Sequence, residues 1–232
     1  MEDVKKQRLI AHFGQEWFDV LEPALNHSYY SELGDKLNKM RKEGQILYPA
    51  GKDTYKAFRA TPFSQVRVVW LGMDPYSSEM ANGLSFDCTN SRDISPSWSK
   101  MLEVYEDAHP GYFGKLLGGD LYEWAEQGVF MLNAALTVPR GRSGAHLNLW
   151  KPFTRTVIKR LVERNYMPLF VLIGADAKKF CYGFDIPEDY KIEVEHPAYA
   201  ARQNRKWNAP TIFEDINLHL NRYKGIPIDW EK

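Results

Sequence analysis

The chain has 232 residues, enough for one well-buried domain, and its 44% hydrophobic and 26% charged residues are typical of a globular protein. This composition excludes a disordered tail, a collagen-like chain and a coiled coil. Thirty Lys and Arg side chains balance thirty Asp and Glu, so the net charge is zero and no overall field predicts binding to nucleic acid or membrane.

The first quarter of the sequence predicts helices. Apolar residues recur at helical spacing over residues 9–25, which indicates one amphipathic helix. A second helix is predicted over residues 31–42, ending before Gly44. Residues 47–51 are typical of a turn-rich loop, and residues 54–59 of a short helix.

Four short apolar runs follow, and helical stretches separate them. The runs cover residues 66–71, 129–132, 169–173 and 192–194. The helices are expected over residues 98–107, 121–127, 153–164 and 211–223. Such alternation predicts an α/β fold: a central, mostly parallel four-stranded sheet flanked by helices on both faces. No linker or repeat divides the chain, so we expect a single domain over residues 1–232.

We expect an intracellular protein. Cys88 and Cys181 lie far apart, which excludes a CxxC site, an iron–sulfur cluster and a disulfide framework and favours a reducing compartment. Residues 1–13 mix charged and apolar residues, unlike a signal peptide, and no apolar run approaches the roughly 20 residues of a membrane span. The expected location is the cytoplasm of a bacterium or of a virus-infected cell, or a nucleus, without membrane association.

Polar residues follow the predicted strands directly. Asp74, Asn133 and His196 come just after the first, second and fourth apolar runs. Ligands of open α/β sheets bind at the carboxyl ends of the strands, so these three side chains are candidates for one site. Taken singly, an Asp before Pro is more often a turn former, and a lone His is more often a packing residue.

The motifs of several common enzyme classes are absent from the sequence. Gly51 and Lys52 are similar to the end of a phosphate loop, but Ile46 and Asp53 stand where its first Gly and its Ser or Thr belong. There is no G-x-G-x-x-G after a strand, no H-E-x-x-H and no G-x-S-x-G. We therefore expect neither a metal nor a cofactor.

Several blocks resemble one known family. Residues 72–77, G-M-D-P-Y-S, are similar to the G-Q-D-P-Y-H motif of family 1 uracil-DNA glycosylases, and residues 81–86, A-N-G-L-S-F, to that family's A-x-G-L-S-F segment. Residues 132–138, L-N-A-A-L-T-V, resemble its L-N-x-x-L-T-V block, and His196–Pro197 its H-P-S-P-L-S loop. The resemblance covers nearly the whole chain. It implies an enzyme that flips deoxyuridine out of DNA, releases uracil and leaves an abasic site, as in base excision repair.

The resemblance also implies roles for single residues. Asp74 would stabilise the cationic sugar and orient water, and His196 would donate a hydrogen bond to the uracil 2-oxo group. Asn133 would read the edge of uracil, and Tyr76 would block the methyl group of thymine. Phe86 would stack on the base. Met73 replaces the Gln of the motif, so its contact with the substrate would come from the backbone.

The DNA-binding positions carried over from the family differ in part from its pattern. The residues concerned are Ser97, Gly174, Ala175, Pro197, Ala198 and Ala200, and the nearby Tyr199 and Arg202 are further candidates for contact with DNA. Ala175 and Ala198 lack the serine hydroxyls of the family, and Ser77 replaces the motif His. Ala200, too small to fill the gap, stands where a Leu of the family enters the base stack. Either Tyr199 beside it stacks in its place, or the flipping step is driven differently.

Basic clusters also follow the predicted strands: Arg140 and Arg142, Lys178 and Lys179, and the group Arg202, Arg205 and Lys206. On one edge of the sheet they would give a local positive surface that the zero net charge conceals.

The expected partner is uracil-containing single- or double-stranded DNA, with a proteinaceous inhibitor or a replication protein as a further candidate, and the expected state is a monomer. A catalytically weak relative that serves as a DNA-binding or replication-accessory module remains the alternative. A glycosylase with a changed base preference is a third hypothesis, which Tyr76 and Asn133 disfavour.

Overall fold

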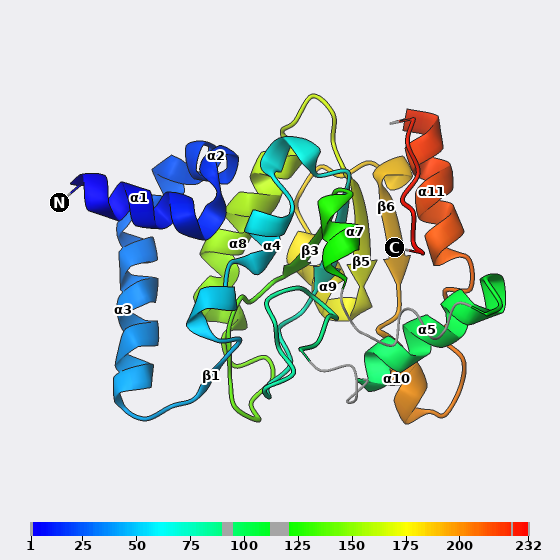
Figure 1. The fold of residues 1–232 in the computed structure, drawn as a ribbon, viewed down its shortest axis with the longest axis horizontal. Coiled ribbons are helices and arrows are strands. Elements are labelled where there is room, and N and C mark those ends of the chain that lie inside the picture. The colour runs from blue at the N-terminus through cyan, green and yellow to red at the C-terminus, as the bar shows by residue number, and fades with distance from the viewer. Residues whose placement is uncertain (1, 90–94, 112–120, 224, 232) are drawn as a thin grey trace.

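A computed structural model describes residues 2–89, 95–111, 121–223 and 225–231. Its centre is a four-stranded sheet with the strand order β3-β2-β5-β6, in which every neighbouring pair is parallel (Figure 1). The strands β2 (Val68–Gly72), β3 (Val129–Asn133) and β5 (Leu169–Ile173) are buried along their whole length. The edge strand β6 (Lys191–Val194) is partly exposed. Three continuous apolar runs form buried parallel strands because helices cover both faces. The predicted α/β fold is confirmed.

Helices and short elements surround this sheet. The helices are α1 (Glu2–Phe13), α2 (Gln15–Leu25), α3 (Ser28–Lys42), α4 (Lys56–Ala60), α5 (Pro96–Ala108), α7 (Tyr122–Glu126), α8 (Leu147–Val162), α9 (Gly174–Cys181), α10 (Pro197–Arg202) and α11 (Ile212–Tyr223). Short 3-10 turns cover Gly51–Asp53, Phe63–Gln65 and Glu188–Tyr190. A separate two-stranded antiparallel sheet joins β1 (Leu47–Tyr48) to β4 (Val138–Pro139).

Aromatic side chains form the core on both faces of the sheet. Phe130 of β3 lies beside Val69 of β2 in the register, so Phe130 and Trp70 point to opposite faces. Phe130 stacks on Trp17 of α2 with ring centroids 4.8 Å apart, whereas Trp70 stacks on Phe213 of α11 at 6.0 Å. Aromatic side chains therefore form two clusters, which hold helices against either face of the sheet.

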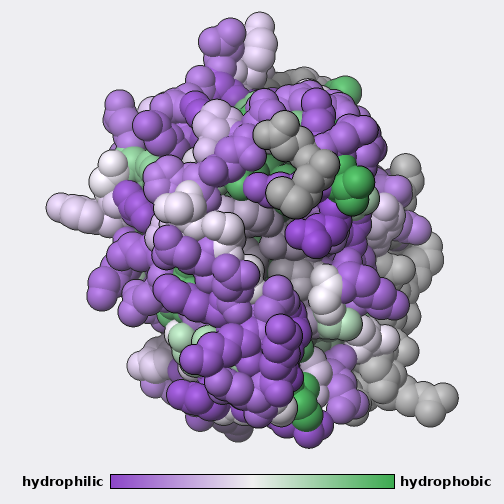
Figure 2. Space-filling model, turned by 90° about the vertical axis from the view of Figure 1, so that its left-hand side faces the viewer, coloured by the Kyte–Doolittle hydropathy of each residue, from purple (hydrophilic) through white to green (hydrophobic). Residues whose placement is uncertain are grey.

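The outer side of the amino-terminal helices is polar. The face that carries α1, α2 and α3 is covered mostly by hydrophilic side chains, with isolated apolar ones between them (Figure 2). Helix α3 shows why, because it buries Leu33 and Leu37 and exposes most of its charged residues. None of the helices in the described parts of the chain is both long and apolar enough to cross a membrane.

Some predicted elements differ from the structure. The helix expected over residues 9–25 is two helices, because Gly14 between α1 and α2 adopts a φ of 79°, which a continuous helix does not allow. The loop expected over residues 47–51 begins with β1, whose partner β4 lies far along the chain. Helix α8 begins at Leu147, before Pro152 rather than after it. The short helices α9 and α10 were not predicted.

The order of the strands places a crevice next to β2. The chain passes from β2 to β3 on one side and later to β5 on the other side, so the connections diverge at the carboxyl ends of β2 and β5. Such a switch point is where open α/β sheets bind ligands.

Candidate active site

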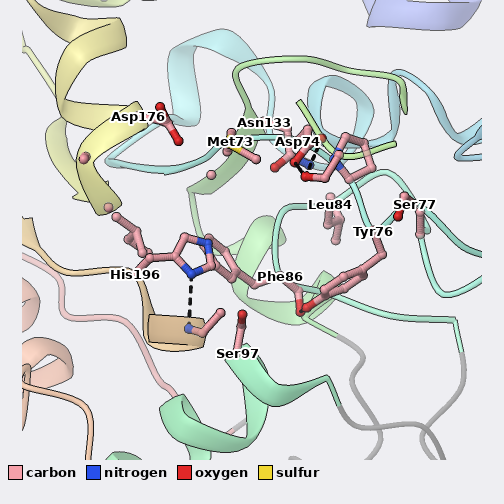
Figure 3. Close-up of a pocket in the computed structure, with 18 of the residues that line it drawn as sticks. Met73, Asp74, Tyr76, Ser77, Leu84, Phe86, Ser97, Asn133, Asp176 and His196 are labelled. Carbon is pink, nitrogen blue, oxygen red and sulfur yellow. Dashed lines mark hydrogen bonds between the residues drawn. The ribbon is translucent and has the colours of Figure 1, made fainter. Parts of the chain in front are cut away.

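A pocket of about 450 Å³ opens at this switch point. Asp74, Tyr76, Phe86, Asn133 and His196 all line it, as the sequence predicted (Figure 3). It is also lined by the predicted DNA-contact or substrate positions Met73, Ser97, Gly174, Ala175, Ala198 and Arg202. The volume falls within the range of small-molecule sites. The segments after β2, β3, β5 and β6 thus converge on one cavity.

Asp74 is held by a loop that follows β4. The Ser143 hydroxyl donates to Asp74 at 3.0 Å from Oδ1 and 3.1 Å from Oδ2, and the backbone N–H of Gly144 donates to Oδ2 at 2.6 Å. Burial raises the pKa of Asp74, and the charge of Asp176 raises it further, whereas the two hydrogen bonds lower it. These donors orient the carboxylate and favour its ionised form. Neither Ser143 nor Gly144 was predicted from the sequence.

His196 is fixed in one orientation at the start of α10. Its Nδ1 accepts a hydrogen bond from the backbone N–H of Ala198 at 3.2 Å. In the neutral ring the proton is then on Nε2, which makes that nitrogen a donor. Burial lowers the pKa of His196, Arg202 lowers it as well, and Asp176 opposes them. A neutral imidazole with a donating Nε2 results.

Two glycines allow these side chains to approach the backbone. A Cβ atom at Gly72 would lie 2.6 Å from Oδ1 of Asn133, the residue beside it on β3. Gly174 has a φ of 88°, and a Cβ there would lie 3.0 Å from Cβ of His196. Any larger residue at either position would displace a side chain of the pocket.

Asn133 is buried at the end of β3, and its amide makes no hydrogen bond to any residue that the structure describes. A buried amide without a protein partner on the wall of a pocket is suited to hydrogen-bond a ligand. Met73 lies on the same wall, where its carbonyl oxygen accepts from the Ala135 N–H at 3.0 Å.

Tyr76 and Phe86 form the aromatic side of the pocket. The Tyr76 hydroxyl donates to the Phe86 carbonyl at 3.0 Å, so the Ser95 hydroxyl donates to the Tyr76 oxygen at 2.7 Å. Ser95 also accepts from the Trp98 N–H and so caps α5. The Phe86 ring lies 5.7 Å from the ring of His196, with its backbone at a φ of 65°. Hydrogen bonds therefore orient the Tyr76 ring, and the Phe86 ring packs beside His196.

A buried pair supports the loop that carries Phe86. Asn82 donates to Asp87 at 2.6 Å, and the Cys88 N–H donates to the other Asp87 oxygen at 2.9 Å. Burial raises the pKa of Asp87 to about 6, although Lys56 lies 4.0 Å away. This pair was not predicted from the sequence.

The segment after His196 corrects one prediction. Ala200 is fully buried where α10 packs against α5, so it is not on the DNA-facing surface and cannot enter a base stack. Tyr199 beside it is 45% exposed. Pro197 is buried as the first residue of α10, and Ser97 is buried where α5 meets the pocket.

Acidic partners neutralise much of the predicted basic surface. Arg140 pairs with Glu79, Lys178 with Glu193, Arg205 with Glu195 and Lys206 with Asp107. Within the described residues, Arg142, Lys179 and Arg202 make no ion pair, and Arg202 alone among them lines the pocket. The positive surface is thus narrower than the sequence indicated.

No group of three or more His, Cys, Asp or Glu side chains in the described residues could hold a metal ion.

Together, the parallel sheet and the pocket define an α/β protein with a polar and aromatic site at the carboxyl ends of its strands. The family model described as the uracil DNA glycosylase superfamily matches residues 58–221. The uracil-DNA glycosylase of Proteus mirabilis is 33% identical over 217 residues, 93% of this chain and 95% of that protein. The one of Streptococcus thermophilus is 37% identical over 219 residues, 93% of this chain and 98% of that protein. The chain belongs to the uracil-DNA glycosylase superfamily, whose activity is the excision of uracil from DNA.

Solved structures agree with this membership. The crystal structure of mimivirus uracil-DNA glycosylase matches with a TM-score of 0.83 and 27% identity, covering 95% of this chain and 88% of that one. A variant of the mimivirus enzyme in complex with UGI matches equally well. The enzyme of Nitratifractor salsuginis shares the fold, with a TM-score of 0.63 at 18% identity.

Proposed function

We propose that this chain flips deoxyuridine into the pocket and hydrolyses its N-glycosidic bond, with Asp74, Asn133 and His196 as the groups that act on the nucleotide. The observation that carries the proposal is their convergence. A carboxylate oriented by two donors, an amide without a partner and an imidazole with a donating Nε2 all line one cavity. Excision of uracil requires one group of each kind.

The reaction begins when the bond between the sugar C1′ and the uracil N1 breaks. Its electron pair leaves with uracil, and positive charge develops on the sugar. Ionised Asp74 stabilises that cation and orients a water molecule, whose oxygen bonds to C1′ while its proton passes to Asp74 or solvent. His196 donates from Nε2 to the uracil O2, where the negative charge grows. Such a preorganised donor contributes about 10²–10³ in rate, and solvent then protonates the released uracil anion.

Base selection follows from the walls of the pocket. The Asn133 amide accepts from uracil N3–H and donates to O4, a pattern that cytosine reverses. Thymine differs from uracil only by a methyl group, so its rejection requires steric exclusion. Tyr76 supplies that exclusion, because hydrogen bonds to Phe86 and Ser95 fix its ring. The Phe86 ring stacks on the base, which contributes roughly 1–3 kcal/mol.

Tyr199 is proposed as the wedge that occupies the space left by the flipped nucleotide. It is exposed, three residues after His196, and aromatic, so it can stack on the neighbouring bases. The buried Ala200 cannot do this. Backbone N–H groups of Gly174, Ala175 and Ala198 then hold the phosphates, in place of the missing hydroxyls.

Uracil-containing DNA, single- or double-stranded, is the proposed substrate. A protein inhibitor is a candidate partner, since a mimivirus relative was solved in complex with UGI. Monomeric action, the single domain and an intracellular location stay predictions. The departures from the family's pattern that favoured a non-catalytic binding module are the missing serine hydroxyls and the altered wedge, which concern how DNA is held. The groups proposed to act on the nucleotide are all present.

The test is excision from oligonucleotides that contain one uracil, as single strand and as duplex, with EDTA present and thymine as the control base. We expect free uracil and an alkali-labile site. Asp74→Asn and His196→Ala should each lower the rate at least about 100-fold, while the exposed Asp185→Asn retains it. Binding without release would favour the accessory module, and full activity of both pocket variants would refute the assigned roles.

A further inference from the structure

Two arginines lie close to the Tyr199 ring, and their other contacts differ. The guanidinium carbon of Arg205 lies 5.6 Å from the ring centroid and that of Arg202 lies 5.9 Å from it. Both distances are within the range of cation–π attraction. The two residues would look equivalent in the sequence, as members of one basic cluster.

Each of the three nitrogens of the Arg205 guanidinium donates a hydrogen bond within the protein. Its Nε donates to Gln203 at 2.9 Å, its Nη1 to the Lys206 carbonyl at 3.2 Å, and its Nη2 to Glu195 at 2.6 Å. A planar guanidinium held at all three nitrogens has a fixed orientation. It is poorly placed to turn towards a phosphate, because doing so would break these bonds.

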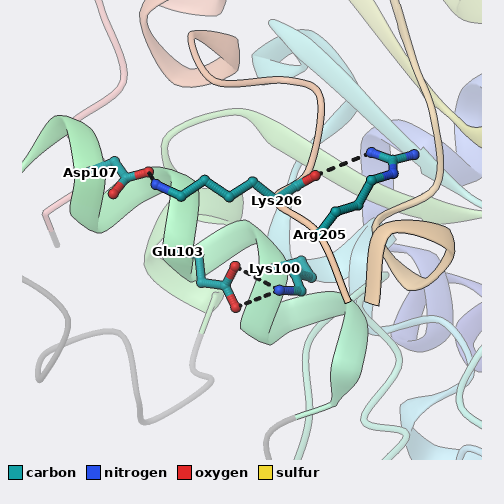
Figure 4. A network of polar contacts seen from close by, with 5 residues as sticks. All are labelled: Lys100, Glu103, Asp107, Arg205 and Lys206. Carbon is teal, nitrogen blue, oxygen red and sulfur yellow. Dashed lines mark hydrogen bonds and ion pairs between the residues drawn. The ribbon is translucent and has the colours of Figure 1, made fainter. Parts of the chain in front are cut away.

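Glu195 is itself a rigid anchor. It directly precedes His196, and its carbonyl oxygen accepts from the Trp207 indole N–H at 2.8 Å. Lys206, which accepts from Arg205 through its carbonyl, also forms an ion pair with Asp107 of α5 at 2.6 Å (Figure 4). Contacts on both sides therefore hold the segment after α10 in place.

Arg202 differs from Arg205 in its contacts within the protein. It lines the pocket, and within the described residues it makes neither a hydrogen bond nor an ion pair. Its five N–H donors remain available for a phosphate, and guanidinium groups bind phosphate well.

We propose that Arg205, anchored by Glu195, is a positioning residue that holds the Tyr199 ring ready for insertion into duplex DNA, while Arg202 binds a DNA phosphate directly. This inference rests on the proposed role of Tyr199 as the wedge. Arg205 therefore acts on the opening of the duplex and not on the chemical step. A single-stranded substrate has no paired helix to open, so it should not depend on Arg205.

The test compares excision rates on duplex and single-stranded uracil oligonucleotides over a series of salt concentrations. Arg205→Ala should lower the duplex rate about two- to fivefold, the effect of one exposed cation–π contact, and leave the single-strand rate and the salt dependence unchanged. Arg202→Ala should weaken binding to both substrates and reduce the slope of log affinity against log salt by about one. Arg222→Ala, an exposed arginine on α11, is the matched control and should change neither.

Double variants distinguish the loss of the Arg205 contact with Tyr199 from the effect of an unpaired Glu195 charge. Arg205→Ala leaves the Glu195 charge next to His196, and Glu195→Gln combined with Arg205→Ala removes it. If the duplex defect persists in this double variant, Arg205 acts through Tyr199; if activity returns, the unpaired charge was the cause and the inference is overturned. In a Tyr199→Ala background, Arg205→Ala should have no further effect, and an additive loss would overturn the inference.

The outcomes for Tyr199 and Arg205 are distinguishable. If Tyr199→Ala leaves the ratio of duplex to single-strand rates unchanged, the wedge proposal fails and this inference fails with it. If Tyr199→Ala lowers the ratio and Arg205→Ala does not, the wedge proposal stands and only the inference about Arg205 is overturned.

Discussion

Replacing Ser143 with alanine tests whether the loop after β4 prepares Asp74 for catalysis. The substitution removes the hydroxyl that donates to both Asp74 oxygens and leaves the Gly144 N–H in place. Burial already raises the pKa of Asp74, and the Ser143 hydrogen bond opposes that shift. Without it the pKa rises further, so a larger share of the enzyme carries a protonated, inactive Asp74 at mildly acidic pH.

The size of the effect follows from the exposure of Ser143. A hydrogen bond to a charged group contributes about 1.5–3 kcal/mol to the stability of that group. Ser143 is exposed, so water replaces part of the lost interaction and the lower end of this range applies. About 1.5 kcal/mol corresponds to a loss of about tenfold in kcat/KM on the acidic side of the pH profile. At higher pH, where Asp74 is ionised in both proteins, the loss should be smaller.

The assay is kcat/KM for uracil release from a single-stranded oligonucleotide, measured across the acid limb of the pH profile. The acid limb of the variant should lie at higher pH than that of the parent. Ser31→Ala is the matched control, since this exposed α3 serine donates to Ser28 far from the pocket. An unchanged profile for Ser143→Ala would refute the view that this hydroxyl supports the ionised carboxylate.

Three further predictions concern base selection, pH dependence and stability. Tyr76→Ala should excise thymine from a T-containing oligonucleotide, whereas Tyr76→Phe keeps the ring and should not; equal thymine rejection by both would remove Tyr76 as the excluding wall. Asp176→Asn should extend activity to lower pH, because the Asp176 charge raises the pKa of both Asp74 and His196, and the reaction needs the first ionised and the second neutral. An acid limb that stays in place would contradict this. Burial raises the pKa of Asp87 from 3.8 to about 6, so the stability due to this group is present at low pH and is lost as pH rises through that interval, by about 3 kcal/mol. Urea unfolding between pH 4 and 7 should show a flatter pH dependence for Asp87→Asn, and the same slope in both proteins would count against it.

The strands and the site residues next to them were predictable because each depends on a local pattern. The run over residues 169–173 predicted β5 at its observed bounds, since a continuous apolar run in this context has few alternatives. Asp74, Asn133 and His196 each stand at or just beyond a strand end, and parallel strands bring those ends to one edge. Gly72 and Gly174 could have been recognised by the same logic, as residues between a strand and a polar side chain.

What could not be predicted depends on contacts between distant segments. Ser143 meets Asp74 across 69 positions of the chain, and no local pattern identifies that serine. Charge counting also has a limit: Lys178 and Arg205 look like free cations in the sequence, but their acidic partners become apparent only when the segments pack. The burial of Ala200 is another such case, because the packing of α10 on α5 decides which residue of the loop faces outward.

The backbone of Phe86 has a consequence for how this protein can change. A bulky residue at a φ of 65° is strained by about 1–3 kcal/mol, and glycine or asparagine would relieve the strain. Either replacement would also delete the ring that is proposed to stack on the base. Because that ring is also buried in the core, its truncation would cost about 3–5 kcal/mol of packing, more than the relief of strain would return. Selection for stability and selection for repair therefore favour the same residue at this position, and the backbone conformation persists because the buried ring outweighs its strain.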